Sequence, residues 1–470
     1  MKRYEQLADV VAQMIRSDVL APGDKVPSIR QASAQHGVSP STVFQAYYLL
    51  ESRGLIRARE RSGYYVSENV RKLLPEPAPS LPISSSTEVS VNDTIFSVLD
   101  AMQHPELVPL GAAFPSSELF PLDKLSQSLR RANRVGNSAG ADTNLSPGNE
   151  LLRRAISRRY MTAGVPVSPE DIIITNGALE ALTLSLQTVA QPGDVVAIES
   201  PGFYAALQAI QMLKLKAVEI PMDSGAGMNL AALEEALERQ TISACWCMTN
   251  FQNPLGSTMT TSKKKALVEL LAKYEVPLIE DDVYAELYFG NNYPQPAKAF
   301  DDKGLVILCS SFSKSLAPGY RIGWAVPGRY FEKIRRAKLM TTLSACVPAQ
   351  LALADYLHKG LYDRYLRKLR QLLEDQQLLM STAVATHFPP GTRISRPKGG
   401  FFLWVELPAE VDTMALYRLA LEQGVSIAPG PIFSASGDYS HCLRLNYGLP
   451  RAALGPAVET VGRLACALMK

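Results

Sequence analysis

The chain has 470 residues, of which 47% are hydrophobic and 20% are charged. These fractions are ordinary for a globular protein, and they exclude a disordered chain, a collagen-like repeat and a charge-rich rod. At about 150 residues per domain, the length predicts two to four domains. The net charge of +3 does not by itself indicate a nucleic-acid-binding protein, but residues 1–72 carry eleven Lys and Arg against seven Asp and Glu.

The cysteines and the N-terminus bear on the cellular compartment. Six cysteines lie mostly in apolar runs: Cys245, Cys247, Cys309, Cys346, Cys442 and Cys466. So few cysteines in such surroundings indicate reduced thiols, and predict neither a disulfide framework nor a metal site. The N-terminus has polar residues inside its apolar pattern, unlike a signal peptide, and no apolar run approaches about 20 residues. We therefore expect a cytoplasmic protein without a membrane span.

The first 70 residues predict three helices followed by a hairpin. Apolar residues between Leu7 and Ile15 recur at the spacing of a helix. Ser28 can cap a second helix that stops at Gly37, and Ser39, which is followed by proline, can cap a third. Two strand patterns, LIRARE and GYYVSE, then flank a glycine turn. This order predicts a winged helix-turn-helix.

The third predicted helix is the candidate recognition helix. Such a helix presents the side chains of its first turns to base edges in the major groove. Here these side chains are small hydroxyl groups and an amide, which can pair with bases, while nearby arginines can bind phosphates. The candidate DNA contacts are Arg30, Ser39, Ser41, Thr42, Gln45, Arg59 and Arg61. Taken singly, these residues are equally typical of a solvated surface, and only the joint pattern favours DNA.

Three short motifs in this region resemble the GntR-type winged helix. They are PGD-x-x-PS-x-R, GVS-x-x-TV and L-x-x-x-GLI, the last leading into a glycine-tipped wing. The resemblance covers residues 2–67. It implies that this part binds operator DNA as a dimer.

A stretch rich in proline and serine separates this head from the rest of the chain. It contains four prolines between residues 75 and 82, followed by three consecutive serines. This composition predicts a semi-extended linker. We therefore expect a DNA-binding domain over residues 1–70, a linker over residues 71–95 and a larger domain over residues 96–470.

In the larger domain, strand patterns alternate with helical stretches. The strand patterns include DIIIT, VVAIE, SACWCM, VPLIED and LVILCSS. This alternation predicts an α/β fold with a mostly parallel central sheet, followed by a smaller α+β part that contains GGFFLWVEL and CLRLNYGL. Ligands of such sheets bind beyond the carboxyl ends of the strands.

Three of these strands end in residues suited to parts of one ligand. DIIIT leads into Asn176, Gly177 and Ala178, a glycine turn that opens a helix and suits a phosphate. SACWCM leads to Asn253, which precedes a proline, and VPLIE leads to Asp281. A buried carboxylate is costly unless it meets a cation, such as a protonated pyridine nitrogen. Each signal alone is also typical of an ordinary turn or a structural salt bridge.

The fourth strand, LVILCSS, leads into Lys314. A lysine just beyond a buried strand can have a lowered pKa and attack an aldehyde. Ser311, Ser313 and Arg321 flank it with hydroxyl groups and a guanidinium that could bind a phosphate. Lys314 by itself would be read as a surface lysine, so its interpretation depends on these neighbours.

The larger domain resembles the fold type I (aspartate aminotransferase-like) enzymes that use pyridoxal phosphate, most specifically in SSFSKSLAPGYRIGW. The resemblance implies that Lys314 forms a Schiff base with the cofactor. It implies that Asp281 pairs with the pyridine nitrogen and that Tyr284 lies near the phenolic oxygen. It also implies that Arg444 binds a substrate carboxylate.

The resemblance also implies a set of cofactor contacts, with Phe203 stacked on the ring and Tyr204 as its alternative. These contacts are Gly177, Ala178, Leu179, Phe203, Asn253, Asp281, Tyr284, Ser311, Ser313, Lys314 and Arg321. Relatives often have serine and glutamine where this chain has Ala178 and Leu179, so backbone amides must bind more of the phosphate. Thr143 stands where some relatives send a tyrosine across the dimer.

A winged helix joined to this domain resembles the MocR class of GntR regulators. The resemblance implies a homodimer, in the class a head-to-tail swapped one, that uses pyridoxal phosphate to sense an amine, an amino acid or the vitamer itself. A ligand that reacts at Lys314 shifts DNA affinity if it prefers one arrangement of the heads. The alternative is a catalytically active aminotransferase with an accessory DNA-binding head. A third hypothesis is a cofactor-free dimerisation scaffold.

Overall fold

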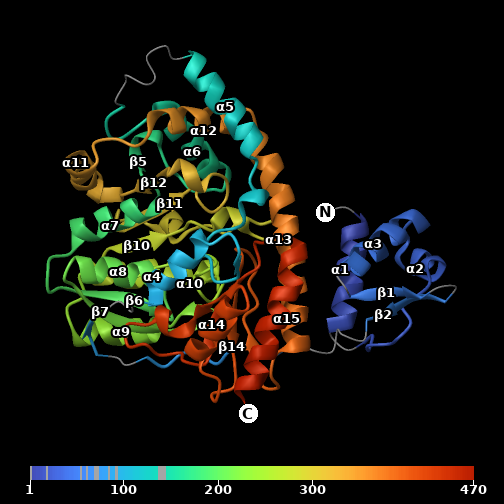
Figure 1. Cartoon of the computed structure of the whole chain (residues 1–470). Helices are drawn as coiled ribbons and strands as arrows, with labels where there is room; N and C mark the ends of the chain where they lie inside the picture. The colour runs from blue at the N-terminus through green and yellow to red at the C-terminus, as the bar shows by residue number, and fades with distance from the viewer. Residues whose placement is uncertain are drawn as a thin grey trace.

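The computed structural model describes residues 3–16, 19–52, 55–59, 62–67, 74–82, 85–89, 94–135 and 144–469. Arg61 and Thr143, which the sequence singled out, lie outside these ranges. Figure 1 shows a small N-terminal unit and a much larger α/β unit. None of the helices in these ranges combines the length and apolar character that a membrane crossing requires.

The N-terminal unit is a winged helix. Its elements are α1 (Arg3–Arg16), α2 (Ile29–His36), α3 (Pro40–Ser52), β1 (Ile56–Arg59) and β2 (Gly63–Val66). Its apolar core is separate from that of the larger unit and includes Val43, Tyr47 and Leu50. The Tyr47 hydroxyl donates to the Pro27 carbonyl at 2.6 Å, which satisfies the polar end of this buried ring.

The predicted helix starts in this unit are confirmed. Ser28 and Gln31 form a capping box at the start of α2, and Gly37 ends this helix in the left-handed conformation, with φ 61°. The backbone N–H of Thr42 donates to the Ser39 hydroxyl at 3.2 Å at the start of α3. The two helices are therefore joined by a short turn, as in a helix-turn-helix.

A large mixed sheet forms the centre of the larger unit. Among the described residues it has nine strands, in the order β3-β7-β6-β9-β10-β11-β12-β5, with β8 attached to β7. The strands are β3 (Thr87–Glu88), β5 (Ile173–Thr175), β6 (Val195–Ser200), β7 (Lys216–Asp223), β8 (Gly227–Met228), β9 (Ala244–Cys247), β10 (Leu278–Asp281), β11 (Val306–Ser311) and β12 (Gly323–Val326).

The strand directions gather the predicted site residues at one edge of this sheet. Five neighbouring strands of the sheet are parallel to one another, in the spatial order β7, β6, β9, β10 and β11. β12 is antiparallel to β11 and β5 is antiparallel to β12, so β5 again points the same way as β11. The carboxyl ends of β5, β9, β10 and β11 therefore lie along a common edge, as the sequence predicted.

Helices cover both faces of the sheet (Figure 1). One apolar cluster joins one face to helices that include α7, α8 and α11, and another joins the opposite face to helices that include α6, α10 and α12. The helices before the long connecting helix are α4 (Thr94–Asp100), α5 (Leu122–Val135), α6 (Glu150–Thr162), α7 (Ala178–Val189), α8 (Tyr204–Met212), α9 (Leu230–Arg239), α10 (Thr261–Lys273), α11 (Phe331–Thr341) and α12 (Val347–His358).

A smaller α+β part follows the connecting helix α13 (Leu361–His387). Its sheet has the strand order β13-β14-β17-β16, and a separate short pair joins β4 to β15. Its elements are β4 (Val108–Pro109), β13 (Arg393–Ile394), β14 (Phe402–Glu406), α14 (Thr413–Glu422), β15 (Val425–Ser426), β16 (Ala428–Pro429), β17 (Cys442–Asn446) and α15 (Arg451–Leu468). The pairing of β4 with β15 brings residues 110–116 beside β17.

The connection between the two units is bound to the larger unit along part of its length. β3 lies within the predicted linker, yet it pairs with β7 at the edge of the central sheet. The N–H of Ile394 donates to the Pro75 carbonyl at 3.0 Å, and the N–H of Ser80 donates to the Met222 carbonyl at 2.9 Å. Proline lacks an N–H, but its carbonyl still accepts a hydrogen bond, so an extended proline-rich segment can dock on a neighbouring surface.

Candidate functional site

Lys314 lies just beyond β11, at the edge of the sheet where the strand ends meet. Its side chain is buried, and Nζ donates to the Ala113 carbonyl at 2.8 Å. The Phe114 ring covers it, with the ring centroid 3.4 Å from Nζ. Burial lowers the pKa of Lys314 to about 7, although the nearby Asp281 carboxylate opposes this shift. Near neutral pH, much of this amine is therefore in the neutral form that attacks a carbonyl carbon.

Asp281 ends β10, the strand beside β11. Its side chain is 1% exposed, and its Oδ1 has no hydrogen-bond partner among the described residues. Burial raises the pKa of Asp281 to about 7, against the opposing effect of Lys314. An unpaired carboxylate oxygen in the interior is costly. The site is therefore arranged to receive a donor, and the N–H of a protonated pyridine ring fits this requirement.

Arg444 and Asn253 form the next part of the site. Arg444, on β17, is fully buried, and its guanidinium lies 4.1 Å from the centroid of the Phe402 ring. Its Nη1 donates to Asn253 Oδ1 at 2.8 Å and its Nη2 donates to the Gly111 carbonyl at 2.6 Å. Arg444 Nε and Asn253 Nδ2 have no partner within the described ranges. These remaining donors can bind a carboxylate and a phenolic oxygen.

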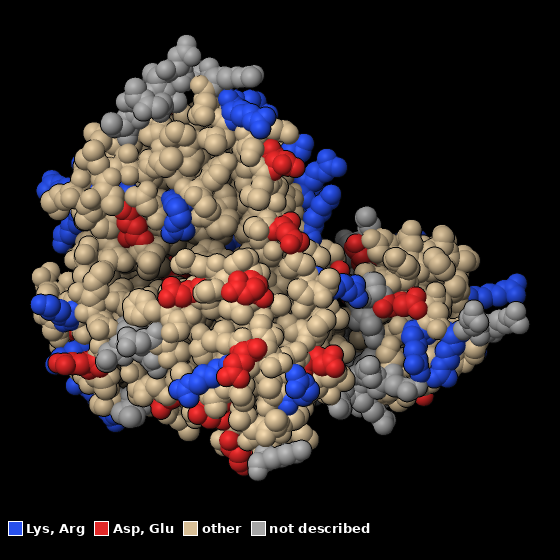
Figure 2. All heavy atoms as spheres, in the orientation of Figure 1, with Lys and Arg blue, Asp and Glu red and all other residues tan. Residues whose placement is uncertain are grey.

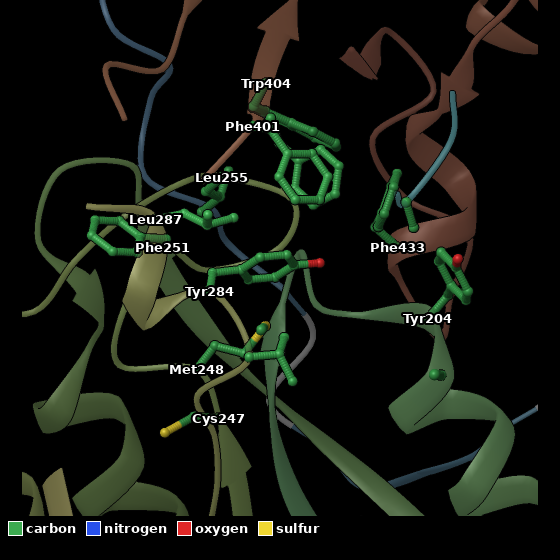
Figure 3. Packing of buried hydrophobic residues seen from close by; sticks show 14 of the residues in the cluster. Tyr204, Cys247, Met248, Phe251, Leu255, Tyr284, Leu287, Phe401, Trp404 and Phe433 are labelled. Carbon is green, nitrogen blue, oxygen red and sulfur yellow. The ribbon is translucent and has the colours of Figure 1, made fainter. Parts of the chain in front are cut away.

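Aromatic rings surround this guanidinium. The Tyr284 ring packs edge-on against Phe401, with the centroids 5.4 Å apart. Figure 3 shows the Tyr284 hydroxyl pointing toward the side on which Tyr204 and Phe433 lie. The centroids of these two rings are 6.1 Å apart. Burial raises the pKa of Tyr284, so its hydroxyl stays protonated and can donate a hydrogen bond to a ligand oxygen.

Phe203 and Tyr204 lie side by side at the start of α8. Their ring centroids are 5.0 Å apart and the rings are tilted, so this geometry leaves both as candidates for stacking on a cofactor ring. The turn that carries them is fixed by Gln252, whose Nε2 donates to Glu199 Oε2 at 3.2 Å and to the Pro201 carbonyl at 2.9 Å. No motif in the sequence marked this buried amide.

The predicted phosphate site lies where the start of α7 meets the loop after β11. Gly177 precedes the helix with φ 82°, and no side chain of the described residues caps the helix. Arg321 Nη1 donates to the Ser313 hydroxyl at 3.1 Å, and the N–H of Ser313 donates to the Ser311 hydroxyl at 3.3 Å. A Cβ atom at position 177 would lie 2.4 Å from Arg321 Nη2. Glycine therefore leaves room for a cradle of helix amides, hydroxyls and a guanidinium, which fits a phosphate.

Ala178 and Leu179 are the first two residues of α7. Their side chains carry no hydrogen-bonding group, so they offer only backbone N–H groups to a ligand. At this helix start, only the backbone amides and the helix dipole are therefore available to bind a phosphate. Ser311, Ser313 and Arg321 of the facing loop are the polar side chains that could add to such a site.

The winged helix presents five of its predicted DNA contacts as exposed residues: Arg30, Ser39, Ser41, Gln45 and Arg59. The Ser39 hydroxyl bonds to the Ser41 hydroxyl at 2.9 Å and to the Thr42 hydroxyl at 2.8 Å. Ser39 is thus engaged as the cap of α3, and a base contact by Ser39 would compete with these bonds. Gln45 is an exposed amide on the face that the sequence assigned to base pairs.

The wing carries a cationic cluster around one aromatic ring. The Arg59 guanidinium lies 4.5 Å from the centroid of the Tyr65 ring, and Lys25 Nζ lies 5.7 Å from the same centroid. Lys25 comes from the turn before α2 and reaches the wing through an antiparallel bridge to Tyr65. No sequence pattern marked Lys25. Figure 2 shows Lys and Arg side chains gathered over the hairpin, where they could contact phosphates.

Two features of the described residues bear on metals and thiols. Within the ranges that the structure covers, no group of three or more His, Cys, Asp and Glu side chains could hold a metal ion. The six cysteines are all free thiols.

Comparisons with known proteins assign both units to families. Residues 116–461 match the class I and II aminotransferases, and residues 3–66 match the gntR family of bacterial regulatory proteins. An uncharacterized HTH-type transcriptional regulator, YdcR of Escherichia coli (strain K12), is 48% identical over 446 residues, which are 95% of each chain. A second, YjiR of the same organism, is 38% identical and covers 98% of this chain and 99% of its own.

Solved structures agree on the fold of the larger unit. The multiple substrate aminotransferase of Thermococcus profundus has a TM-score of 0.75 and 28% identity, covering 81% of this chain and 96% of its own. LysN, an alpha-aminoadipate aminotransferase from Thermus thermophilus complexed with N-(5'-phosphopyridoxyl)-L-leucine, has the same TM-score, identity and coverage. The predicted aminotransferase fold of type I is therefore confirmed.

The fold and these relatives together define a DNA-binding regulator with an aminotransferase-like domain. More specifically, the chain belongs to the MocR-type members of the GntR family, in which the two units are fused over nearly the whole length. The predicted family is therefore confirmed for the head and for the larger unit alike.

Proposed function

We propose that this regulator binds pyridoxal phosphate at Lys314 and uses the occupied site to control operator binding in response to an amine, an amino acid or the vitamer itself. The observation that carries the proposal is a buried lysine with a lowered pKa beside the unpaired oxygen of Asp281. The cradle between Gly177 and Arg321 lies at the same sheet edge. These three features match the aldehyde, the pyridine nitrogen and the phosphate of one cofactor.

The remaining residues of the site would hold the other parts of the cofactor and its ligand. The bound cofactor supplies an electron-withdrawing ring and a reactive carbonyl carbon. Tyr284 and Asn253 would donate hydrogen bonds to the phenolic oxygen. Phe203 or Tyr204 would cover one face of the ring. Arg444 would bind the carboxylate of an amino acid through its free Nε–H group.

The winged helix would read operator DNA as part of a homodimer in the cytoplasm. Two heads related by a two-fold axis can read two half-sites of an operator. Gln45 would contact a base edge, because its exposed amide can pair with adenine. Arg30 and Arg59 would bind the phosphate backbone, which positions the head without reading sequence.

A working aminotransferase is the second candidate function. A full set of candidate catalytic groups is present: Lys314, Asp281, Tyr284 and Arg444. In addition, aromatic-amino-acid aminotransferase 1 of Thermococcus litoralis is 31% identical over 360 residues, covering 74% of this chain and 85% of its own. Sensing and catalysis share the first reaction with an amine, so the site residues alone do not separate them.

One experiment tests both candidates. The protein is loaded with pyridoxal phosphate and bound to an operator selected from random-sequence DNA, and a panel of amines and amino acids is added. We expect a compound that changes the visible spectrum to change the operator Kd as well. A spectral change without any effect on DNA binding would contradict the sensing function. Repeated turnover with an amino acid and a keto acid would support the aminotransferase instead.

A further inference from the structure

The segment that leads from the winged helix to the larger unit touches the cofactor side of that unit. The residue of this segment that makes the contact with the cofactor side is Ser80. The hydroxyl of Ser80 donates to the Ser200 carbonyl at 2.5 Å and accepts from the N–H of Met222 at 2.6 Å. The N–H of Ser80 donates to the Met222 carbonyl at 2.9 Å. One serine thus joins this segment to the ends of β6 and β7.

Ser200 is the last residue of β6, and the turn that carries Phe203 begins there. Three residues of chain span at most about 10 Å, so the carbonyl that Ser80 binds is close to the backbone of Phe203. The Ser200 hydroxyl donates to Glu219 Oε1 at 2.9 Å. Ser200 is therefore bound through its carbonyl by the connecting segment and through its side chain by β7.

The turn between Ser200 and Phe203 has little freedom to absorb a displacement. The N–H of Gly202 donates to the Phe433 carbonyl at 2.8 Å. A Cβ atom at position 202 would lie 2.3 Å from the Glu199 carbonyl oxygen, so the turn is tightly folded. Packed elements move as units and do not deform continuously. A ligand that displaces the backbone at Phe203 would therefore also displace Ser200.

The hydrogen bonds that the connecting segment makes before Ser80 lie on the smaller α+β part. The N–H of Ala78 donates to Glu406 Oε2 at 3.3 Å, and Arg396 Nη2 donates to the Leu74 carbonyl at 3.2 Å. These bonds hold the segment to the region around β13 and β14. Removal of the Ser80 hydroxyl therefore leaves the segment attached there, and it breaks the link to the turn before Phe203.

We propose that Ser80 is a positioning residue that couples occupancy of the cofactor site to the winged helix. Through Ser200, it ties the connecting segment, which first meets the larger unit at Leu74 and Pro75, to the position of the Phe203 turn. A ligand changes DNA affinity only through contacts that differ between two states. The Ser80 hydroxyl bond is such a contact. This inference rests on the proposed function, because it requires both a ligand at Phe203 and DNA at the head.

The test measures operator Kd by fluorescence anisotropy for the full-length protein without cofactor and after loading with pyridoxal phosphate. The variants are Ser80→Ala, the conservative Ser80→Thr, and Ser85→Ala, which removes an exposed serine of the same region. We expect wild type and Ser85→Ala to show a ratio of the two Kd values of about 5 to 150, the usual range of allosteric coupling. In Ser80→Ala this ratio falls below about 2, and in Ser80→Thr it is largely restored.

The visible absorption of loaded Ser80→Ala should match that of wild type, because Ser80 is not among the residues proposed to hold the cofactor. An unchanged Kd ratio in Ser80→Ala would overturn the role of Ser80 and leave the sensing function standing. If the operator Kd of wild type stays the same when the cofactor is added, and also when the amine panel is added, the sensing function itself is refuted. The two failures are therefore distinguishable.

Hydrogen exchange of the wild-type protein gives a second test that does not depend on a variant. The N–H of Ser80 is bonded to the Met222 carbonyl, so its exchange rate reports how firmly the segment is held. We expect loading with pyridoxal phosphate to change the exchange of residues 74–82 together with that of residues 199–203. A change in the second range without a change in the first would refute the coupling.

Discussion

Gly177→Ala is the sharpest perturbation of the phosphate cradle. Gly177 has φ 82° and ψ 172°, a backbone conformation that is essentially restricted to glycine, and an alanine there costs about 1–3 kcal/mol. Its Cβ would lie 2.4 Å from Arg321 Nη2 and 3.0 Å from Arg321 Cζ. The arginine side chain is flexible, so we expect it to swing away from the helix start.

The displaced arginine would lose its bond to the Ser313 hydroxyl and its place beside the phosphate. A hydrogen bond to a charged group contributes about 1.5–3 kcal/mol. Since about 1.4 kcal/mol corresponds to a factor of ten, the Kd for pyridoxal phosphate should rise roughly 10- to 150-fold. The assay is a titration of the cofactor-free protein followed by visible absorption.

Gly319→Ala is the matched control, because Gly319 lies in the loop just before Arg321 and a Cβ there meets no atom within 4 Å. It should bind the cofactor like wild type. In the double variant Gly177→Ala/Arg321→Ala, the second change should add little to the loss caused by the first, since both act through one guanidinium. A Gly177→Ala variant that binds within about twofold of wild type would refute this reasoning.

Three further predictions concern the amine, the base contact and the carboxylate site. The pKa of Lys314 is lowered to about 7, so the neutral fraction of its amine rises about tenfold between about pH 6 and about pH 8. The initial rate of cofactor attachment should therefore rise over this range. A rate that falls with pH would contradict the assignment. Gln45→Ala should reduce discrimination by about 1–3 kcal/mol at one base pair in a competition assay; an equal loss at every sequence would argue for a phosphate contact. Arg444→Lys should weaken binding of amino acids at least about tenfold and spare amines that lack a carboxylate; equal losses for both would remove the proposed role.

Local signals in the sequence were sufficient for much of this architecture. Ser28, Gly37 and Ser39 mark helix ends because capping depends on neighbouring backbone groups. Asp281 and Lys314 could be placed at one edge because strand periodicity shows where each strand ends and parallel strands share an edge. These inferences required no knowledge of contacts between distant parts of the chain.

Contacts between distant segments were beyond such signals. Ala113 and Gly111 hold Lys314 and Arg444 through backbone carbonyls, and a carbonyl oxygen is present in every residue. Ser80 lies in a run of prolines that is typical of a free linker, yet it docks on Ser200, which is 120 residues away. Only the folded structure brings these partners together, because their pairing depends on how the strands and the smaller α+β part pack.

The central claim is that a cofactor joined to Lys314 controls a DNA-binding head. The most direct measurement records visible absorption near ~420 nm and operator anisotropy in one sample while pyridoxal phosphate is added. We predict that wild type develops the band and changes its operator affinity over the same range of cofactor, and that Lys314→Ala does neither. A wild-type protein that stays colourless, or a Lys314→Ala variant with the same change in DNA binding, would contradict the account.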